Sequence, residues 1–332
     1  MAEISVIVPA RNAAHTIERA LGSVLEELTN IDCIVIDDGS TDATADRVLG
    51  MNDSRVRLIT QVHAGVAAAA NRAVQESVAP LIARMDADDV ALPGRLTRQL
   101  QFLRQHDLDI VGGQVNIVDQ DSNPVLSMAR YQRWINSLTN HNQMAAYRFV
   151  ETPIVNPTAL VRHEVFELGY RDGPFPEDYD LWLRAFAAGF RFGILPEPVL
   201  DWVDGPTRLT RSDDRYSFAA FDRSRREHLL SGPLKDRGVV NLWGAGQTGK
   251  PWLRWLRDQQ REIEFVVDIS PGKIGKLIHG TPVISPKELP GVSSSNTIPL
   301  LIAVGREGAR ELIEPVIQKA GYQIGNNAWF VA

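Results

Sequence analysis

The sequence of 332 residues predicts an α/β protein, in which a mostly parallel sheet flanked by helices precedes a second, smaller α/β domain. Short β-branched runs alternate with helical patterns in the first half of the chain, which is typical of βαβ units. A charged, turn-rich segment follows, and beyond it a strand, a glycine-rich turn and a helix begin the alternation again. A chain of this length is also long for a single core, which favours two domains.

The first half of the chain divides into strands and helices in a regular order. Four predicted strands cover residues 4–10, 32–40, 55–60 and 80–85, and the helices between them cover 13–28, 42–51 and 65–77. Asp42 belongs to a residue type that is favoured at helix N-caps. Later elements are a helix over 94–106, a strand over 109–119 and, after a more polar region, a helix over 178–189 that Gly189 closes.

The expected domains are residues 1–205, a linking segment with a helix over 206–237, and residues 238–332. The last domain is predicted to contain strands over 239–243, 262–270 and 297–305 and a closing helix over 306–321.

Charge and targeting signals limit the partners of the chain. The formal net charge of -6 gives no overall attraction to phosphate backbones, so we expect no nucleic-acid partner. The N-terminal residues lack a signal-peptide pattern, and no segment approaches the roughly 20 apolar residues of a membrane helix. We therefore expect a cytoplasmic protein without a transmembrane segment. The single cysteine, Cys33, excludes intrachain disulfides and is expected to be a small buried hydrophobe.

Three polar clusters follow predicted strands of the first domain: "PARN" (9–12), "DDGSTD" (37–42) and "DADD" (86–89). Ligands of open parallel sheets bind outside the carboxyl ends of the strands, near a switch in strand order, so these clusters are expected to form one site. Closely spaced carboxylates repel each other unless a cation lies between them. Their hard oxygen atoms suit Mg²⁺ or Mn²⁺, which commonly complete their shells with water and a substrate diphosphate.

Four segments then identify a family resemblance: "ISVIVPARN", "VIDDGSTD", "IARMDADDVALPGRLTRQLQFL" and "FPEDYDLWLRAFAAGFRF". In this order and at these separations they resemble the family 2 glycosyltransferases of the GT-A fold, over roughly residues 3–211. The resemblance implies inverting, metal-dependent transfer of a sugar from a nucleotide-diphosphate sugar to a sugar, lipid-linked or other hydroxyl acceptor. It also implies a role in making a surface polysaccharide or glycoconjugate.

The resemblance assigns roles to individual residues. Nucleotide-sugar binding is implied for Pro9, Ala10, Arg11, Asn12, Asp38, Arg84 and Asp86. Asp86 and Asp88 form the DxD pair that would hold Mn²⁺ or Mg²⁺, with direct metal contact expected of Asp88. Arg84 and Arg95 flank the aspartates and either balance their charge or contact the donor phosphates.

Asp178 matches the position of the catalytic base in this family. A carboxylate there can take the proton of the attacking hydroxyl, and inversion needs no covalent intermediate. Asp178 has a structural alternative as the N-cap of its helix, and Glu177 and Asp180 are alternative bases. The chain lacks the "QxxRW" pattern of processive polymerases, and "DWVDGPTRLTR" stands in the corresponding region. We therefore expect one sugar to be added per encounter.

The second domain carries a glycine pattern of its own. Gly244, Gly246 and Gly249 follow one predicted strand and Asp268 ends the next, which is the form of a dinucleotide fingerprint. The surrounding sequence also resembles Rossmann-like accessory domains of some sugar-modifying acyltransferases and C-methyltransferases. The alternatives are therefore a second nucleotide site and a structural or homo-oligomerising role.

Two other functions compete with sugar transfer. A sugar-1-phosphate nucleotidyltransferase should carry a glycine-rich N-terminal loop, and "VPARNAAHT" has none. A non-catalytic nucleotide-sugar sensor is the other alternative, although the intact "DADD" and "ED" sequences favour catalysis.

Overall fold

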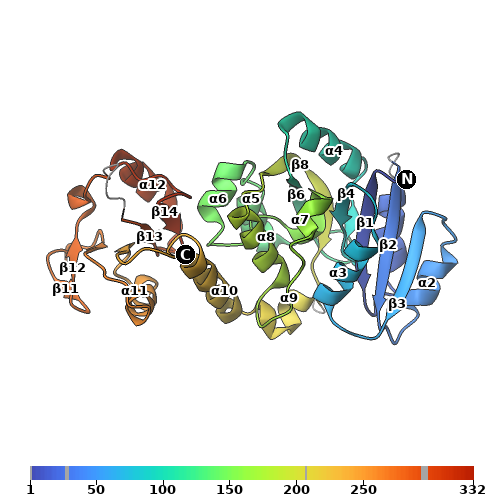
Figure 1. Cartoon of the computed structure of the whole chain (residues 1–332), viewed down its shortest axis with the longest axis horizontal. Helices are drawn as coiled ribbons and strands as arrows, with labels where there is room; N and C mark the ends of the chain where they lie inside the picture. The colour runs from blue at the N-terminus through green and yellow to red at the C-terminus, as the bar shows by residue number, and fades with distance from the viewer. Residues whose placement is uncertain (1, 27–29, 206–207, 293–297) are drawn as a thin grey trace. The chain divides into compact units, whose positions relative to one another are not determined.

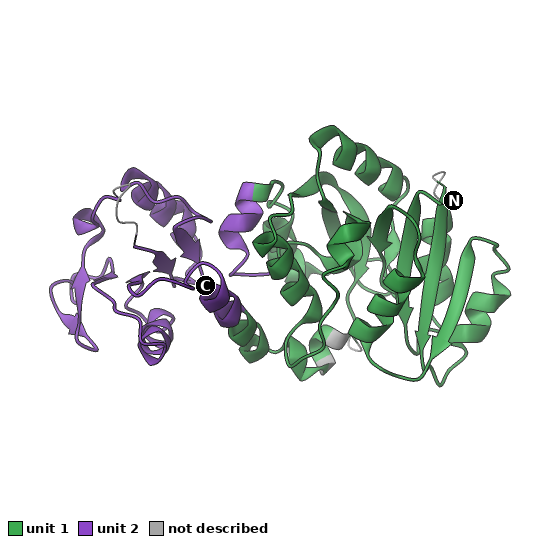
Figure 2. Cartoon of the chain, viewed as in Figure 1, with its two compact units in different colours: residues 1–141, 152–224 green, residues 142–151, 225–332 purple. Residues whose placement is uncertain are grey.

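The computed structural model describes residues 2–26, 30–205, 208–292 and 298–332. The chain forms two compact units, one of residues 1–141 and 152–224 and the other of residues 142–151 and 225–332 (Figure 2). Four predicted bounds lie outside the described residues: the start of the first domain at 1, the end of the first helix at 28, the start of the linking segment at 206 and the first residue of the strand at 297. The domain bounds expected from the sequence stay predictions.

The described residues of the first unit contain a sheet of eight strands with helices packed around it (Figure 1). In spatial order the strands are β3 (Val56–Gln61), β2 (Ile31–Asp38), β1 (Ile4–Ala10), β4 (Leu81–Arg84), β7 (Leu160–Arg162), β6 (Ile110–Val118), β8 (Phe192–Val203) and β5 (Val90–Ala91). The pairs from β3 to β4 are parallel, as is β6 with β8, while β7 and β5 pair antiparallel with their neighbours. This mixed, mostly parallel sheet confirms the predicted fold class.

The described helices of this unit include the predicted ones, near their expected positions, and short helices that the sequence did not predict. They are α1 (Ile17–Leu25), α2 (Thr44–Gly50), α3 (Val66–Glu76), α4 (Arg95–His106), α5 (Ala129–Ile135), α7 (His163–Phe166), α8 (Glu177–Ala187), α9 (Leu209–Ser212) and α10 (Phe218–Ser231), with 3-10 turns η1 (Leu126–Met128), η2 (Asn156–Thr158) and η3 (Asp214–Tyr216). The N-cap position of α2 is Ala43 and not the predicted Asp42. The Asp42 carboxylate instead accepts the N–H groups of Thr44 and Ala14, at 3.0 and 3.1 Å, and so joins two loops.

Strand order explains where a ligand can bind. Strands β2 and β3 lie on one side of β1, in the order of the sequence. The chain then crosses over, so that β4 lies on the other side of β1. The switch point therefore lies between β1 and β4, at their carboxyl ends. Every residue of β1 and β4 is buried, so these two strands form a rigid floor beneath that point.

The described part of the second unit holds a sheet of six strands and the helix α6 (His141–Tyr147), which begins one residue before the unit does. The spatial order is β11 (Leu277–Ile278), β12 (Thr281–Ile284), β10 (Val266–Val267), β9 (Asn241–Trp243), β13 (Leu300–Ile302) and β14 (Ala328–Phe330). Helices α11 (Gly249–Asp258) and α12 (Ala309–Lys319) and the 3-10 turn η4 (Pro286–Glu288) accompany this sheet.

Residues 142–151 lie within the sequence of the first unit but pack in the second. The ring of Tyr147 stacks on Phe330 with 5.4 Å between the centroids. The buried Arg225 donates hydrogen bonds to the carbonyl oxygens of Phe149 and Val331, at 3.2 and 3.1 Å. The second unit therefore needs a segment that the chain supplies from far upstream.

Cys33 lies in β2 and is fully buried, as predicted. Burial, followed by the negative charge of Asp32, raises the pKa of its thiol to about 12. Among the residues that the structure describes, no helix has both the length and the apolar character needed to cross a membrane.

Candidate active site

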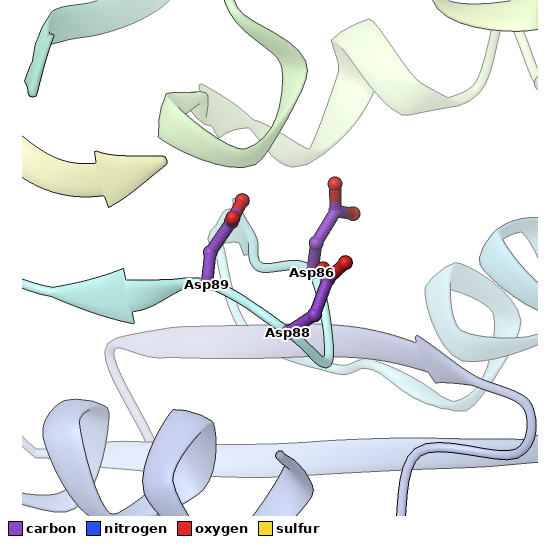
Figure 3. A group of neighbouring side chains, drawn as sticks. All are labelled: Asp86, Asp88 and Asp89. Atoms are coloured by element: carbon purple, nitrogen blue, oxygen red, sulfur yellow. The ribbon is translucent and has the colours of Figure 1, made fainter. Parts of the chain in front are cut away.

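An acidic cluster follows β4 at the switch point. One carboxylate oxygen from each of Asp86, Asp88 and Asp89 lies within 4.8 Å of the others. Figure 3 shows the three carboxylates on the same side of the loop that carries them. Asp89 is fully buried, and while its Oδ1 accepts the N–H of Val203 at 2.9 Å, its Oδ2 has no hydrogen-bond partner. A buried carboxylate oxygen without a partner is costly, so this cluster is suited to a cation.

The electrostatics of the cluster agree with that geometry. Burial, and then the negative charge of Asp86, raise the pKa of Asp88. Burial also raises the pKa of Asp89 well above its ordinary value, and the opposing charge of Arg208 does not offset this effect. The described side chains therefore leave the cluster short of positive charge.

Arg84 lies under this cluster and balances part of its charge. Its side chain is 3% exposed and its Nη2 lies 2.6 Å from Oδ1 of Asp86. It also donates to the carbonyl oxygen of Met85, while its Nε has no hydrogen-bond partner. Arg95 is equally buried and donates to Gln99 at 3.1 Å and to the carbonyl oxygen of Arg84 at 2.9 Å. The ion pair with Asp86 is a charge-balancing contact of Arg84, whereas these contacts of Arg95 are with an amide and a backbone carbonyl.

Arg208 is a neighbour of the cluster that the sequence did not single out. Its nitrogens lie 4.0 Å from Asp86 and 3.8 Å from Asp89, and it donates to the carbonyl oxygen of Val203 at 2.8 Å. Its guanidinium also lies 4.7 Å from the ring centroid of Trp202. The available signal was the basic "DGPTRLTR" that follows a strand, but its charge and turn residues were interpreted as a linker.

A pocket of about 200 Å³ lies beside Arg208. Its lining comes from β6, η1, β8 and the segment after β8, and consists of Ile117, Met128, Trp202, Asp204, Arg208, Thr210 and Arg211. The ring of Tyr131 lies 6.3 Å from that of Trp202. An aromatic wall beside charged groups is a surface that can bind a sugar.

Asp38 ends β2 and is almost completely enclosed. Its carboxylate accepts hydrogen bonds from Gln61 and from the backbone of Ala64 and Gly65, at 2.7 to 2.8 Å, and lies 2.8 Å from Nδ1 of His63. Burial raises the pKa of this carboxyl group, but these donors together outweigh burial and hold the pKa below its ordinary value. Asp38 therefore fixes the chain that follows β3, and His63 is a second residue that the sequence analysis did not single out.

The predicted residues 9–12 end β1 next to Asp38. Pro9 and Ala10 are buried in the strand, whereas Arg11 and Asn12 are exposed beyond it. Asn12 has a φ of 50° and its Oδ1 accepts the N–H of Thr41 at 2.8 Å. This contact joins the ends of β1 and β2, so "PARN" and "DDGSTD" form one surface, as predicted.

Asp178 lies in the first turn of α8, one residue after the helix begins at Glu177. The N-cap position is Pro176, so the alternative role of Asp178 as the N-cap is wrong. Asp178 is half-buried, and its Oδ1 accepts the N–H of Tyr179 at 2.7 Å. The acid therefore keeps a partly accessible carboxylate at the positive end of a helix dipole.

The two alternative bases are engaged with other side chains. Asp180 is buried and paired with Arg171 and with Arg184, whose Nε lies 2.8 Å from Asp180 Oδ2. Glu177 is also buried, and both of its carboxylate oxygens lie within 2.8 Å of the hydroxyl of Tyr216. Burial raises the pKa of Glu177, and the hydrogen bond with Tyr216 opposes this effect.

Arg84 is influenced by charges from both the acidic cluster and the start of α8. Burial lowers the pKa of Arg84, but the charge of Asp86, followed by Tyr170 and Glu177, outweighs burial and raises it. The structure thus brings together the end of β4, the first turn of α8 and the segment after β8.

The glycine pattern of the second unit lies between β9 and α11. Gly244 has a φ of 120°, and a Cβ on Gly249 would lie 1.7 Å from the carbonyl oxygen of Gly244, so both glycines are needed for a tight turn. Asp268 follows β10 and accepts the N–H of Ala245 at 2.9 Å and the ammonium of Lys273 at 3.0 Å. Gly246 is the open position of this loop, with Lys273 Nζ 3.9 Å from the position of an added Cβ. The predicted residues therefore meet at one turn, but Asp268 already binds within the protein.

Comparisons with known proteins identify the family of the chain. A family model described as glycosyl transferase family 2 matches residues 5–169. The UDP-Glc:alpha-D-GlcNAc-diphosphoundecaprenol beta-1,3-glucosyltransferase WfgD of Escherichia coli is 30% identical over 185 residues, which cover 54% of this chain and 68% of that protein. The chain belongs to the family 2 glycosyltransferases.

This glycosyltransferase is also similar to a further sequence relative and to a solved structure. The succinoglycan biosynthesis protein ExoU of Rhizobium meliloti (strain 1021) is 31% identical over 222 residues, 58% of this chain and 59% of that protein. The glycosyltransferase thus spans less than two thirds of the length of this relative. The crystal structure of S. aureus TarS 1-349 in complex with UDP-GlcNAc superposes with a TM-score of 0.53 at 18% identity, covering 69% of this chain and 67% of that chain. At this identity the similarity concerns the fold.

Proposed function

We propose that this glycosyltransferase transfers a sugar, with inversion, from a nucleotide-diphosphate sugar to an acceptor hydroxyl during synthesis of a surface polysaccharide or glycoconjugate. One observation carries the proposal: the carboxylates at the switch point divide into two kinds. Three of them cluster within 4.8 Å, and Asp178 is half-buried in the first turn of α8, between the buried Glu177 and Asp180. Inverting transfer needs such a division, because one set of carboxylates must serve the donor and another must serve the acceptor.

The donor would bind along the ends of β1, β2 and β4. Asp86, Asp88 and Asp89 fit Mg²⁺ or Mn²⁺, since they offer hard oxygen ligands and Asp89 Oδ2 lacks a partner. When bound, the cation would neutralise the charge that develops on the departing nucleoside diphosphate. The surface at the ends of β1 and β2, where Asn12 contacts Thr41, would hold the nucleoside, with Asp38 supporting it from below, and Arg84 would keep Asp86 in position.

Asp178 would act on the acceptor. The acceptor oxygen attacks the anomeric carbon as the bond from that carbon to the diphosphate oxygen breaks, and Asp178 takes the hydroxyl proton. No covalent sugar–enzyme intermediate is required. Asp180 and Glu177 are less suited to this role, because ion pairs hold the first and Tyr216 holds the second.

The acceptor would bind in the pocket beside Arg208, on the side of the cluster away from Asp38. The Escherichia coli relative is named for transfer to GlcNAc-diphosphoundecaprenol, a lipid-linked saccharide. Lipid-linked saccharides are therefore the first class of acceptor to test. Without a "QxxRW" pattern, transfer of one sugar per encounter is proposed. For the second unit we propose a structural or homo-oligomerising role ahead of nucleotide binding, since the Asp268 carboxylate already has protein partners.

A thermal-shift panel of nucleotide sugars, each with and without Mn²⁺, tests this proposal. A donor that binds the native state raises the melting temperature by mass action, and the increase should require the metal. Incubation with lipid-linked saccharides should then release the nucleoside diphosphate, and NMR of the product should show an inverted anomeric configuration. Donor binding without turnover on any acceptor would favour the sensor alternative, and retention of configuration would contradict the role of Asp178.

A further inference from the structure

The contacts of Arg208 place it beside the acidic cluster without fixing it there. Its distances of 4.0 Å to Asp86 and 3.8 Å to Asp89 are those of an ion pair and too long for direct hydrogen bonds. The carbonyl oxygen of Val203 and the ring of Trp202 hold the guanidinium independently of the cluster. Arg84 differs, because it is 3% exposed and lies 2.6 Å from Asp86.

Charge explains what Arg208 does at this position. Three carboxylates that repel one another face Arg84, which is locked, and Arg208, whose side chain is 11% exposed at the edge of the pocket. A guanidinium about 4 Å from two carboxylates supplies part of the positive charge that a divalent cation would supply, and it also repels that cation.

We infer that Arg208 is a built-in counter-ion of the acidic cluster and that it makes cation binding depend on the nucleotide. A diphosphate at the cluster offers Arg208 two neighbouring oxygen acceptors, which the planar guanidinium can bind in a bidentate manner. When Arg208 pairs with the diphosphate, the negative charge of the diphosphate offsets the repulsion between Arg208 and the cation, so nucleotide and cation bind together. This inference rests on the proposed function in assuming that the cluster takes a divalent cation.

The test measures Mn²⁺ binding to the full chain by the EPR signal of free Mn²⁺, alone and with UDP or GDP. Arg208→Met keeps an apolar side chain over Trp202 and removes the charge, Arg208→Gln is a second neutral variant, and Arg208→Lys keeps the charge. Arg211→Met is the matched control, because Arg211 lies on the same segment but pairs with Asp204 at 2.5 Å.

Without nucleotide, the Arg208→Met and Arg208→Gln chains should bind Mn²⁺ about tenfold more tightly than wild type, since a nearby like charge is gone. They should also lose most of the gain in Mn²⁺ affinity that UDP or GDP gives the wild type. Arg208→Lys should bind Mn²⁺ alone as wild type does, because the charge is kept, and Arg211→Met should behave as wild type with and without nucleotide. Melting temperatures show which variants are folded, and one folded neutral variant is sufficient.

Two results would overturn the inference, and they are distinguishable. If folded neutral variants bind Mn²⁺ alone no more tightly than wild type, Arg208 is not a counter-ion, and the proposed function is unaffected. If the wild type binds no Mn²⁺ with or without either nucleotide, the proposed metal dependence and the inference both fail.

Discussion

Three acids of one helical turn have three different environments. Asp178 is half-buried, Asp180 is held by two arginines and Glu177 is enclosed with Tyr216. The sequence "EDYD" presents them as near equivalents, and only their partners separate them. The role of a carboxylate depends on these surroundings, because burial, charge and hydrogen bonds decide where its proton is held.

Asp178→Asn should lower turnover by about 10²-fold or more, the usual contribution of a positioned general base, while donor affinity stays near that of wild type. Asp180→Asn is the contrasting variant on the same helix. It should lower the free energy of unfolding by about 1–3 kcal/mol, because it removes the buried carboxylate that accepts hydrogen bonds from Arg171 and Arg184. Donor binding by calorimetry, turnover and chemical denaturation separate the two effects. Normal turnover in Asp178→Asn would shift the search for the base to Glu177.

Asp88→Ala should abolish the metal-dependent rise in melting temperature that a nucleoside diphosphate causes, because alanine offers no oxygen ligand. The fold should persist, since no hydrogen bond of the Asp88 side chain stabilises a neighbouring element among the contacts described above. Asp121→Ala, at an exposed carboxylate beyond β6, is the control. An unchanged metal-dependent rise in a folded Asp88→Ala chain would remove this residue from the site.

Glu177 should give the stability of the protein a distinct pH dependence. The unfolded chain loses this proton near the ordinary value of 4.5, whereas the folded chain holds it to higher pH. The stability that Glu177 contributes is therefore complete below about pH 4.5 and is lost as the pH rises through the folded pKa. The free energy of unfolding of wild type, relative to Glu177→Gln, should fall over that window in denaturant titrations. Tyr216→Phe removes the hydrogen bond that lowers this pKa, so it should extend the window upward.

At the scale of elements, local patterns predicted what lies along one strand or helix. Strand β1 matches the predicted 4–10, and α3 and α4 begin within one residue of their predicted starts. Alternation and helical periodicity are local, so these elements can be read from neighbouring residues. The carboxyl ends of β1, β2 and β4 lie at one edge of the sheet, because these strands pair in parallel.

Local sequence patterns did not predict the role of the segment after β8. Its residues Arg208 and Tyr216 were assigned to a linker, since charge and turn residues locally resemble one. Their partners, Asp86, Asp89 and Glu177, lie far earlier in the chain, and no local pattern encodes such pairs. Residues 142–151 illustrate the same limit, because their partners in the second unit follow much later.

At the scale of the whole molecule, the second unit is completed by residues 142–151, so removing it changes the first half of the chain. A chain ending at Arg237 should still bind nucleotide and metal, because the residues assigned to that site all precede this position. It should nevertheless be less soluble, since Tyr147 loses its stacking on Phe330 and Arg225 loses the carbonyl oxygen of Val331.

Tyr147→Ser provides the matched comparison for this truncation. It should improve the solubility of the shortened chain and destabilise the full chain, where the ring is stacked. Sedimentation and melting temperature measure the two effects. A shortened chain that is soluble yet binds no nucleotide would show that the second unit contributes to the donor site.

Cys33 offers a way to time the opening of the central sheet. It is the single thiol of the sequence, and with a pKa of about 12 it carries almost no thiolate at neutral pH while β2 stays paired with β1 and β3. A maleimide dye can then react only in molecules in which β2 has transiently separated from β1 and β3. The labelling rate therefore measures how often the sheet opens. Because β1 and β2 also carry the surface at their ends where Asn12 contacts Thr41, saturating nucleotide should slow the labelling, which would report occupancy of the site before any acceptor is known.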